Sequence, residues 1–97
     1  GGIYGNRRSR ANSNYKGLAA ALENNKELSK DVHIAWQRYL QCDWGNLGEE
    51  DKEMNDNAVK EPKSDRILAR YSTAEGDIYI ITEWNRIYIT FMFCDEY

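Results

Sequence analysis

A run of acidic residues follows an Asp-Trp-Gly turn near the middle of the chain. Five carboxylates fall within the eight residues 49–56. Clustered carboxylates can coordinate a metal ion, act in general acid–base catalysis or present an acidic surface to a partner. They can also begin a helix, because acids in the first turn complement the positive end of the helix dipole.

A calcium-binding loop of the EF-hand type requires oxygen ligands at fixed positions. With Asp43 as the first position, the third is Gly45, the fifth is Leu47 and the twelfth is Met54. Two ligand positions and the bidentate glutamate are therefore missing. The spacing does not predict a calcium loop.

The residues for other metal or nucleophilic chemistry are sparse. His33 is the only histidine, and Cys42 and Cys94 are the only cysteines, so three clustered soft ligands are not available. On one helix, His33 and Cys42 would be separated by about 13 Å of rise, too far for a nucleophile–base pair. No glycine-rich phosphate loop is present. We therefore predict no catalytic residue, no metal and no cofactor, and we favour a protein that is not an enzyme.

The net charge of −3 hides an asymmetry along the chain. Residues 1–16 carry +4 and no acid, whereas residues 43–61 carry −5. The basic start lies near Tyr15 and could bind nucleic acid, although the chain is acidic overall and contains no nucleic-acid-binding motif. The acidic run at 49–56 could instead imitate phosphates before a basic groove. Both alternatives remain open. The candidate nucleic-acid contacts are Arg7, Arg8, Arg10 and Lys16.

A protein partner is the leading expectation, and two regions are candidates for binding it. One is the acidic run with the turn before it, and the other is the short connection at residues 84–86. The candidate partner-binding residues are Asp43, Trp44, Glu49, Glu50, Glu53, Trp84 and Arg86. We also expect Trp44 to anchor its turn in the core, so packing and binding are both open for this residue.

The composition indicates a single globular domain over residues 1–97. Hydrophobic residues make up 41% of the chain and charged residues 30%, which is typical of soluble proteins. No apolar run approaches the roughly 18 residues of a membrane helix. Two cysteines are too few for a disulfide framework, which favours free thiols in a reducing, cytoplasmic setting.

Hydrophobic periodicity predicts helices first and strands afterwards. We expect a basic extended segment at 1–13, then helices at 14–24, 30–41 and 49–60, with Ser29 capping the second helix. The period then changes to two, which predicts strands at 66–73, 77–83 and 87–94. The helical part at 14–61 and the meander at 66–94 together predict an α+β fold, with three helices packed on one face of a three-stranded antiparallel sheet.

Alternation within the expected strands also assigns side chains to the two sheet faces. Ile87, Ile89, Phe91 and Phe93 form an apolar face for the helices to cover. The opposite face carries Tyr79, Tyr88 and Met92, and it could be an exposed contact surface. A covering N-terminal segment or a homodimer are the alternatives for this face.

Several motifs in order resemble a family of small uncharacterised bacterial proteins carried on plasmids, integrative elements and phages. The family pattern is a GDWG-x-L-x-x-E-D-x-x-x-N run, then R-[IL]-L-x-x-Y, then I-I-T-E and a final E-Y. Here the run begins at Asp43 and reaches Asn55, the strands match at 66–71 and 80–83, and the chain closes with Asp95-Glu96-Tyr97. Cys42 replaces the first glycine of the pattern, and Gly48 replaces its helix-cap serine.

The resemblance covers roughly residues 33–97 and implies a mobile-element context. Members are often labelled plasmid-related proteins or named after type I restriction subunits. The resemblance carries over no catalytic residue. It favours a non-enzymatic accessory protein that binds a partner, with a modulator of DNA restriction or defence as the alternative.

Overall fold

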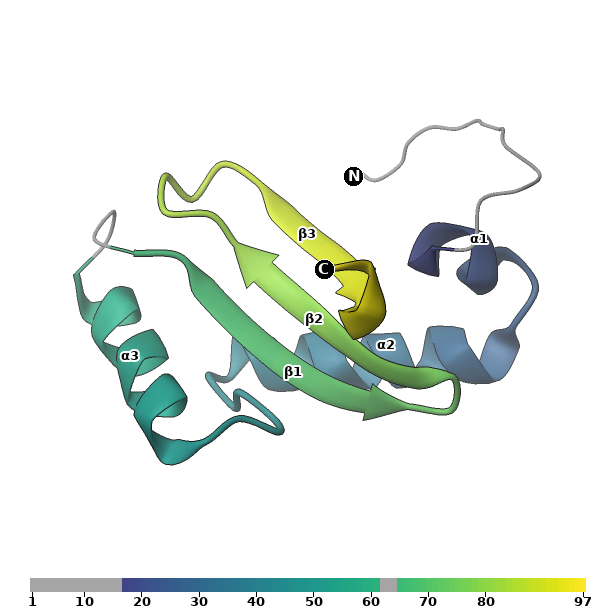
Figure 1. Ribbon diagram of the computed structural model, residues 1–97, viewed down its shortest axis with the longest axis horizontal. Coiled ribbons are helices and arrows are strands. Elements are labelled where there is room, and N and C mark those ends of the chain that lie inside the picture. Colours follow the sequence, from purple (N-terminus) through teal and green to yellow (C-terminus); the bar gives the residue numbers. More distant parts are fainter. Residues whose placement is uncertain (1–16, 62–64) are drawn as a thin grey trace.

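The order of elements follows the change of hydrophobic period along the chain. The computed structural model describes residues 17–61 and 65–97, which form three helices and a three-stranded antiparallel sheet (Figure 1). The predicted α+β class is confirmed. The predicted segment 1–13 and the first residues of the helix expected at 14–24 lie outside the described residues. The elements are α1 (Leu18–Glu23), α2 (Lys26–Leu40), α3 (Glu49–Lys60), β1 (Ile67–Thr73), β2 (Gly76–Thr82), β3 (Ile89–Phe93) and a short 3₁₀ helix, η1 (Cys94–Glu96).

The sheet is a meander in the order β1-β2-β3. Gly76 has φ +120° at the β1–β2 turn, a conformation that glycine adopts without a Cβ clash. The register pairs Ala69 with Ile80 and Ile80 with Phe91, so these side chains share one face. We call this the inner face, because the residues of β1 and β2 on it form the buried core.

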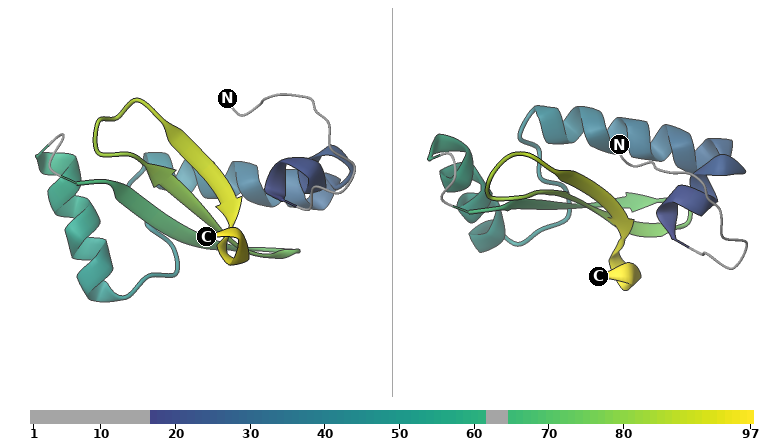
Figure 2. Two further views of the ribbon diagram at one scale, coloured as in Figure 1. Left: turned by 45° about the horizontal axis from the view of Figure 1, so that its top comes forward. Right: turned by 90° about the horizontal axis from the view of Figure 1, so that it is seen from above.

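Helix α2 covers the inner face of the sheet, and α1 packs beside it against β3 (Figure 2). Leu28 and Ala35 of α2 are buried, and Trp36 lies against Phe91 with ring centroids 5.5 Å apart. The predicted start of this helix at residue 30 is wrong. Asn25 caps it instead, since its Oδ1 accepts a hydrogen bond from the Leu28 amide at 2.9 Å. The earlier cap brings Leu28 into the helix and into the core.

Helix α3 lies along the outer edge of β1 and occupies the predicted residues 49–60. Its first turn contains Glu49, Glu50 and Asp51, which complement the helix dipole. Asn55 and Ala58 are its buried residues and face β1. The acidic run is therefore the start of a helix whose other side packs on the sheet.

The chain closes the outer edge of β1 just before α3 begins. The Asn46 amide donates to the Arg70 carbonyl at 2.7 Å, and the Arg70 amide donates to the Trp44 carbonyl at 3.2 Å. Gly45 lies between them, and a Cβ there would fall 2.0 Å from the Arg70 carbonyl oxygen. Glycine is therefore required at Gly45 for the two backbones to approach this closely.

The end of the chain folds onto the outer face of the sheet, opposite α2 (Figure 2, right). The Tyr97 ring meets the Tyr79 ring edge-on, with centroids 5.3 Å apart. Ile81 points to this outer face and is 2% exposed. The apolar outer face that the sequence predicted is thus covered in part by the chain's own last residues.

Candidate functional site

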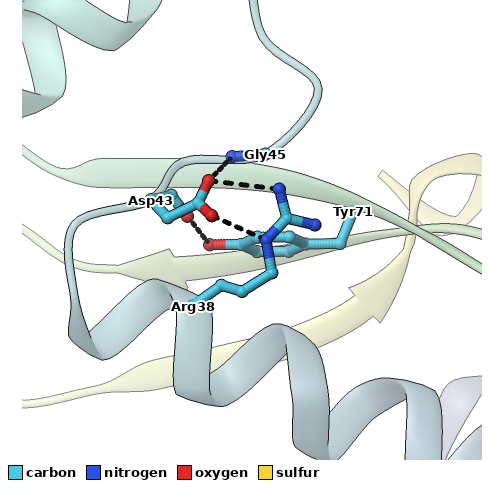
Figure 3. Close-up of polar contacts among 4 residues, drawn as sticks. All are labelled: Arg38, Asp43, Gly45 and Tyr71. Atoms are coloured by element: carbon cyan, nitrogen blue, oxygen red, sulfur yellow. Dashed lines mark hydrogen bonds and ion pairs between the residues drawn. The ribbon is translucent and has the colours of Figure 1, made fainter.

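Asp43 lies at the joint between α2 and α3, where its carboxylate is bonded within the chain (Figure 3). Arg38 donates to it twice, from Nε at 2.8 Å and from Nη2 at 3.1 Å. The Gly45 amide donates to the same carboxylate at 3.2 Å. The hydrogen bond from Arg38 holds the pKa of Asp43 below its usual value. Asp43 therefore shapes the turn, and both of its carboxylate oxygens already have donors.

Tyr71, on β1, contacts this joint from the sheet. Its hydroxyl donates to the Asp43 carbonyl at 2.7 Å, and the Arg38 guanidinium lies 5.3 Å from the centre of its ring. Burial raises the pKa of Tyr71, so the phenol keeps its proton. This tyrosine is a fixed hydrogen-bond donor and not a general base.

Trp44 is part of the core, as predicted from its position in the turn. It is 4% exposed, and its ring meets the Tyr39 ring edge-on with centroids 5.5 Å apart. Its Nε1 donates to Asp56 Oδ1 at 2.9 Å, which ties the turn to α3. A partner could contact almost none of this side chain.

Part of the Asp43–Asn55 run thus meets β1 at one place in the fold. Trp44 and Gly45 close the β1 edge, and Asn55 bonds both backbone groups of Leu68. Cys42, at the position where the family pattern has glycine, adopts φ 61°. The left-handed conformation at that position explains physically why glycine suits it. The motif has an architectural role here.

The acidic candidates Glu49, Glu50 and Glu53 are exposed on α3. Glu49 approaches Lys52 only loosely, at 3.9 Å, and the Glu49 side chain is almost fully exposed. These carboxylates are available to a partner. They are also solvated, which makes them poor candidates for acid–base catalysis.

Arg86 is used within the fold. Its guanidinium donates to the Ala58 carbonyl and to the Asp65 carbonyl, each at 2.7 Å. A cation at the C-terminal end of α3 complements the helix dipole. Its backbone is left-handed, with φ 63°, at the turn between β2 and β3. Arg86 therefore connects this turn to α3 and holds the neighbouring residues in place.

Trp84 belongs to an exposed apolar surface at the β2–β3 turn. Trp84 is 56% exposed, Ile87 69%, Tyr88 66% and Ile89 43%. We call these four residues the hairpin surface. The sequence indicated Trp84, but it predicted that Ile87 and Ile89 lie under a helix, and this prediction is wrong. Tyr39, one residue before the end of α2, bonds Thr82, which pairs with Ile89. The helix therefore ends level with Ile89, and Ile87 lies beyond it.

A shallow hollow of about 460 Å³ lies at the other end of β3, lined in part by Arg70, Asp77 and Cys94. Arg70 and Asp77 form an ion pair at 2.9 Å. Burial raises the pKa of the Cys94 thiol, which opposes formation of a reactive thiolate. Cys94 is therefore a poor candidate for a nucleophile.

Two further findings concern the described parts of the chain. Within residues 17–61 and 65–97, no three potential metal-ligating side chains converge. None of the helices in these ranges is long and apolar enough to cross a membrane. The basic candidates Arg7, Arg8, Arg10 and Lys16 lie outside the described residues.

The candidate site is therefore a surface and not a pocket. Comparison with known proteins adds no identity to it: the chain matches no protein-family model, no curated protein and no solved structure.

Proposed function

We propose that the protein is a non-enzymatic interaction domain of a mobile genetic element, which binds a partner protein through the hairpin surface. The observation that carries the proposal is the exposure of four large apolar side chains within six consecutive residues, 84–89. Burial of apolar area contributes roughly 25 cal/mol per Å². Exposed apolar side chains gathered at one turn often mark contact sites, and Trp and Tyr are enriched at the centres of interfaces. Tyr88 lies on the opposite sheet face from Ile87 and Ile89, so the hairpin surface extends over both faces of the turn.

The turn that presents the hairpin surface is held firmly, which favours binding. Arg86 connects it to α3, the Glu83 amide bonds the Tyr88 carbonyl at 3.1 Å, and the Ile87 amide bonds Asn85 Oδ1 at 3.0 Å. A surface that is already ordered loses little conformational entropy when a partner binds. This rigidity distinguishes the hairpin surface from a collapsed or flexible loop.

The cellular context in the proposal comes from the sequence. The Asp43–Asn55 run and the later strand motifs resemble proteins carried on plasmids, integrative elements and phages. Cys42 and Cys94 are free thiols, which suits the cytoplasm of a bacterial host.

The test is a capture experiment with two matched double variants. Trp84→Ala/Tyr88→Ala removes half of the hairpin surface, and Glu50→Gln/Glu53→Gln neutralises exposed carboxylates on α3. From a bacterial lysate, we expect specific partners to bind the native chain and the α3 variant but not the hairpin variant. Equal capture by the native chain and the hairpin variant, or no specific capture by a native chain that is also monomeric in solution, would contradict the proposal.

A second candidate function is supported by the exposed carboxylates of α3. The acidic run at 49–56 would then imitate phosphates and modulate a protein of DNA restriction or defence. In the same capture experiment, loss of partners only with Glu50→Gln/Glu53→Gln would favour this function.

The alternative of direct nucleic-acid binding through residues 7–16 has its own test. A salt-titrated DNA-binding assay compares the native chain with Arg7→Ala/Arg8→Ala/Arg10→Ala. The proposed function predicts no DNA binding by either protein at low salt. Binding by the native chain that weakens steeply with salt and disappears in the variant would favour this alternative.

A further inference from the structure

The two edges of the sheet differ in how their backbone groups are used. At β1, the outward groups of Leu68 and Arg70 are bonded by Asn55, Trp44 and Asn46. At β3, Tyr88 bonds Glu83 on the β2 side, so in an antiparallel ladder the backbone groups of Ile89 and Phe91 point away from β2. Among residues 17–61 and 65–97, no group bonds to them. In the described parts of the chain, β3 is therefore the open edge.

The open edge lacks the features that prevent strands from pairing between molecules. Natural edge strands often carry charged residues, Pro or bulges that block an incoming strand. Residues 87–93 read Ile-Tyr-Ile-Thr-Phe-Met-Phe, with no charge and no Pro. This edge is continuous with the hairpin surface through Ile87, Tyr88 and Ile89.

We infer that the partner at this surface is a second copy of the chain, paired antiparallel through β3 to form a six-stranded sheet. The inference rests on the proposed use of the hairpin surface. Because 87–93 is uncharged, two copies bring no like charges together at the edge, although each chain carries −3. A strongly charged partner would find nothing to pair with there. Since β1 is closed, pairing through β3 alone stops at a dimer.

The structure also assigns the register of the pairing. The Phe93 amide is already bonded by Glu96 Oε1 at 2.7 Å, so the ladder ends before Phe93. The Ile87 amide is likewise bonded by Asn85 Oδ1 at 3.0 Å, which leaves the outward groups of Ile89 and Phe91, on either side of Thr90. A two-fold axis beside Thr90 places Ile89 opposite Phe91 of the second copy and Phe91 opposite its Ile89. Every opposed pair on the inner face is then apolar.

This arrangement also accounts for Leu40, which is 59% exposed near the end of α2. Leu40 lies one turn beyond Trp36 on the same stripe of the helix, and Trp36 packs on Phe91. A two-fold axis perpendicular to the sheet keeps both α2 helices on the same face. Leu40 then borders the groove between the two helices, and Ile89 lines the floor of that groove.

The first test is the mass of the native full-length chain in solution, measured by light scattering across a concentration series. We expect twice the 11.3 kDa chain mass for the native protein and for the control Met54→Lys, whose exposed side chain lies on α3. Ile89→Lys places a charge opposite Phe91 of the second copy on each side of the axis and should give the single mass with an unchanged circular-dichroism spectrum. A native chain of single mass at all concentrations, or a folded Ile89→Lys that keeps the double mass, overturns the inference.

Amide hydrogen exchange provides a second readout that does not depend on a variant. The amides of Thr90 and Met92 face β2 and should be protected at every concentration, so they are the internal reference. The Ile89 and Phe91 amides should become protected only as the dimer forms. Protection of these two amides in a chain of single mass would indicate that residues 1–16 bond the edge, and it would overturn the inference. If the chain is monomeric but hairpin-dependent capture of another protein persists, the proposed function stands and only the second copy is rejected.

Discussion

The side chain of Asn55 bonds both backbone groups of Leu68, in the manner of a neighbouring strand. Its Nδ2 donates to the Leu68 carbonyl at 2.8 Å, and its Oδ1 accepts from the Leu68 amide at 3.2 Å. Asn55 is 5% exposed, so water cannot easily replace either bond. One carboxamide on α3 thus completes the edge of β1 where the chain provides no strand.

Replacement of Asn55 with Ala should lower the free energy of unfolding by about 2 kcal/mol, because both Leu68 backbone groups lose their partner in a largely buried place. Urea denaturation followed by circular dichroism measures the change. Asn57→Ala is the matched control, since Asn57 is exposed on the same helix and should change stability by less than about 0.5 kcal/mol. Similar values for the two variants would show that the Asn55 bonds add little.

Two tryptophans offer a direct comparison between a core role and a surface role. Trp44→Ala removes a buried ring and its bond to Asp56, and should cost about 3–5 kcal/mol of unfolding free energy. Trp84→Ala removes an exposed ring and should cost less than about 0.5 kcal/mol in the monomer. Thermal denaturation at low protein concentration measures both. An unchanged melting temperature for Trp44→Ala would return this residue to the list of partner contacts.

Cys42→Gly should stabilise the protein. Cys42 is held at φ 61°, which costs a non-glycine residue roughly 1–2 kcal/mol, and the added freedom of glycine in the unfolded chain cancels about 0.5–1 kcal/mol of that gain. We therefore expect a net increase of about 1 kcal/mol in the free energy of unfolding. Cys42→Ser removes the thiol but keeps the strained backbone, and it should show no such increase. A gain shared by both variants would point to the thiol instead.

The Arg38–Asp43 pair should make stability depend on pH at the acidic end. Its hydrogen bond holds the pKa of Asp43 in the folded protein below the unfolded value. The stabilisation is therefore complete above the unfolded pKa, near 4, and disappears as the pH falls through the lower folded pKa. Both side chains are about half exposed, so the contribution is no more than about 1 kcal/mol. Denaturation at pH 7 and pH 2.5 should show a smaller pH difference for Asp43→Asn than for the native chain, with Asp51→Asn as the exposed control.

Local sequence signals predicted the bounds of a helix correctly where several of them indicated the same element. Helix α3 was predicted at its observed bounds because the glycine before it, three acids in its first turn and Pro62 after it all indicate the same element. The start of α2 was missed because Asn25 and Ser29 are both good caps. The choice between them depends on the burial of Leu28, a tertiary contact that no local pattern records.

The candidate site was only partly predictable for the same reason. The predicted alternation of side chains between the two faces of β3 was correct. Which of these side chains a helix covers, however, depends on where α2 ends over the sheet. The roles of Trp44 and Asn55 at the β1 edge join residues 13 or more positions apart. Such contacts follow from the assembled fold and not from periodicity.

Glu96 connects the beginning and the end of the described chain. Its Oε1 accepts from the Leu18 amide at 3.1 Å as well as from Phe93, which brings together groups separated by 78 positions in sequence. Contacts of such large sequence separation form late in folding, because a long loop must first close. Helix α1 has only six residues and would not persist alone in water. We expect α1 to be the last helix to order during refolding and the first to detach during unfolding, on a timescale set by the meander that must precede it.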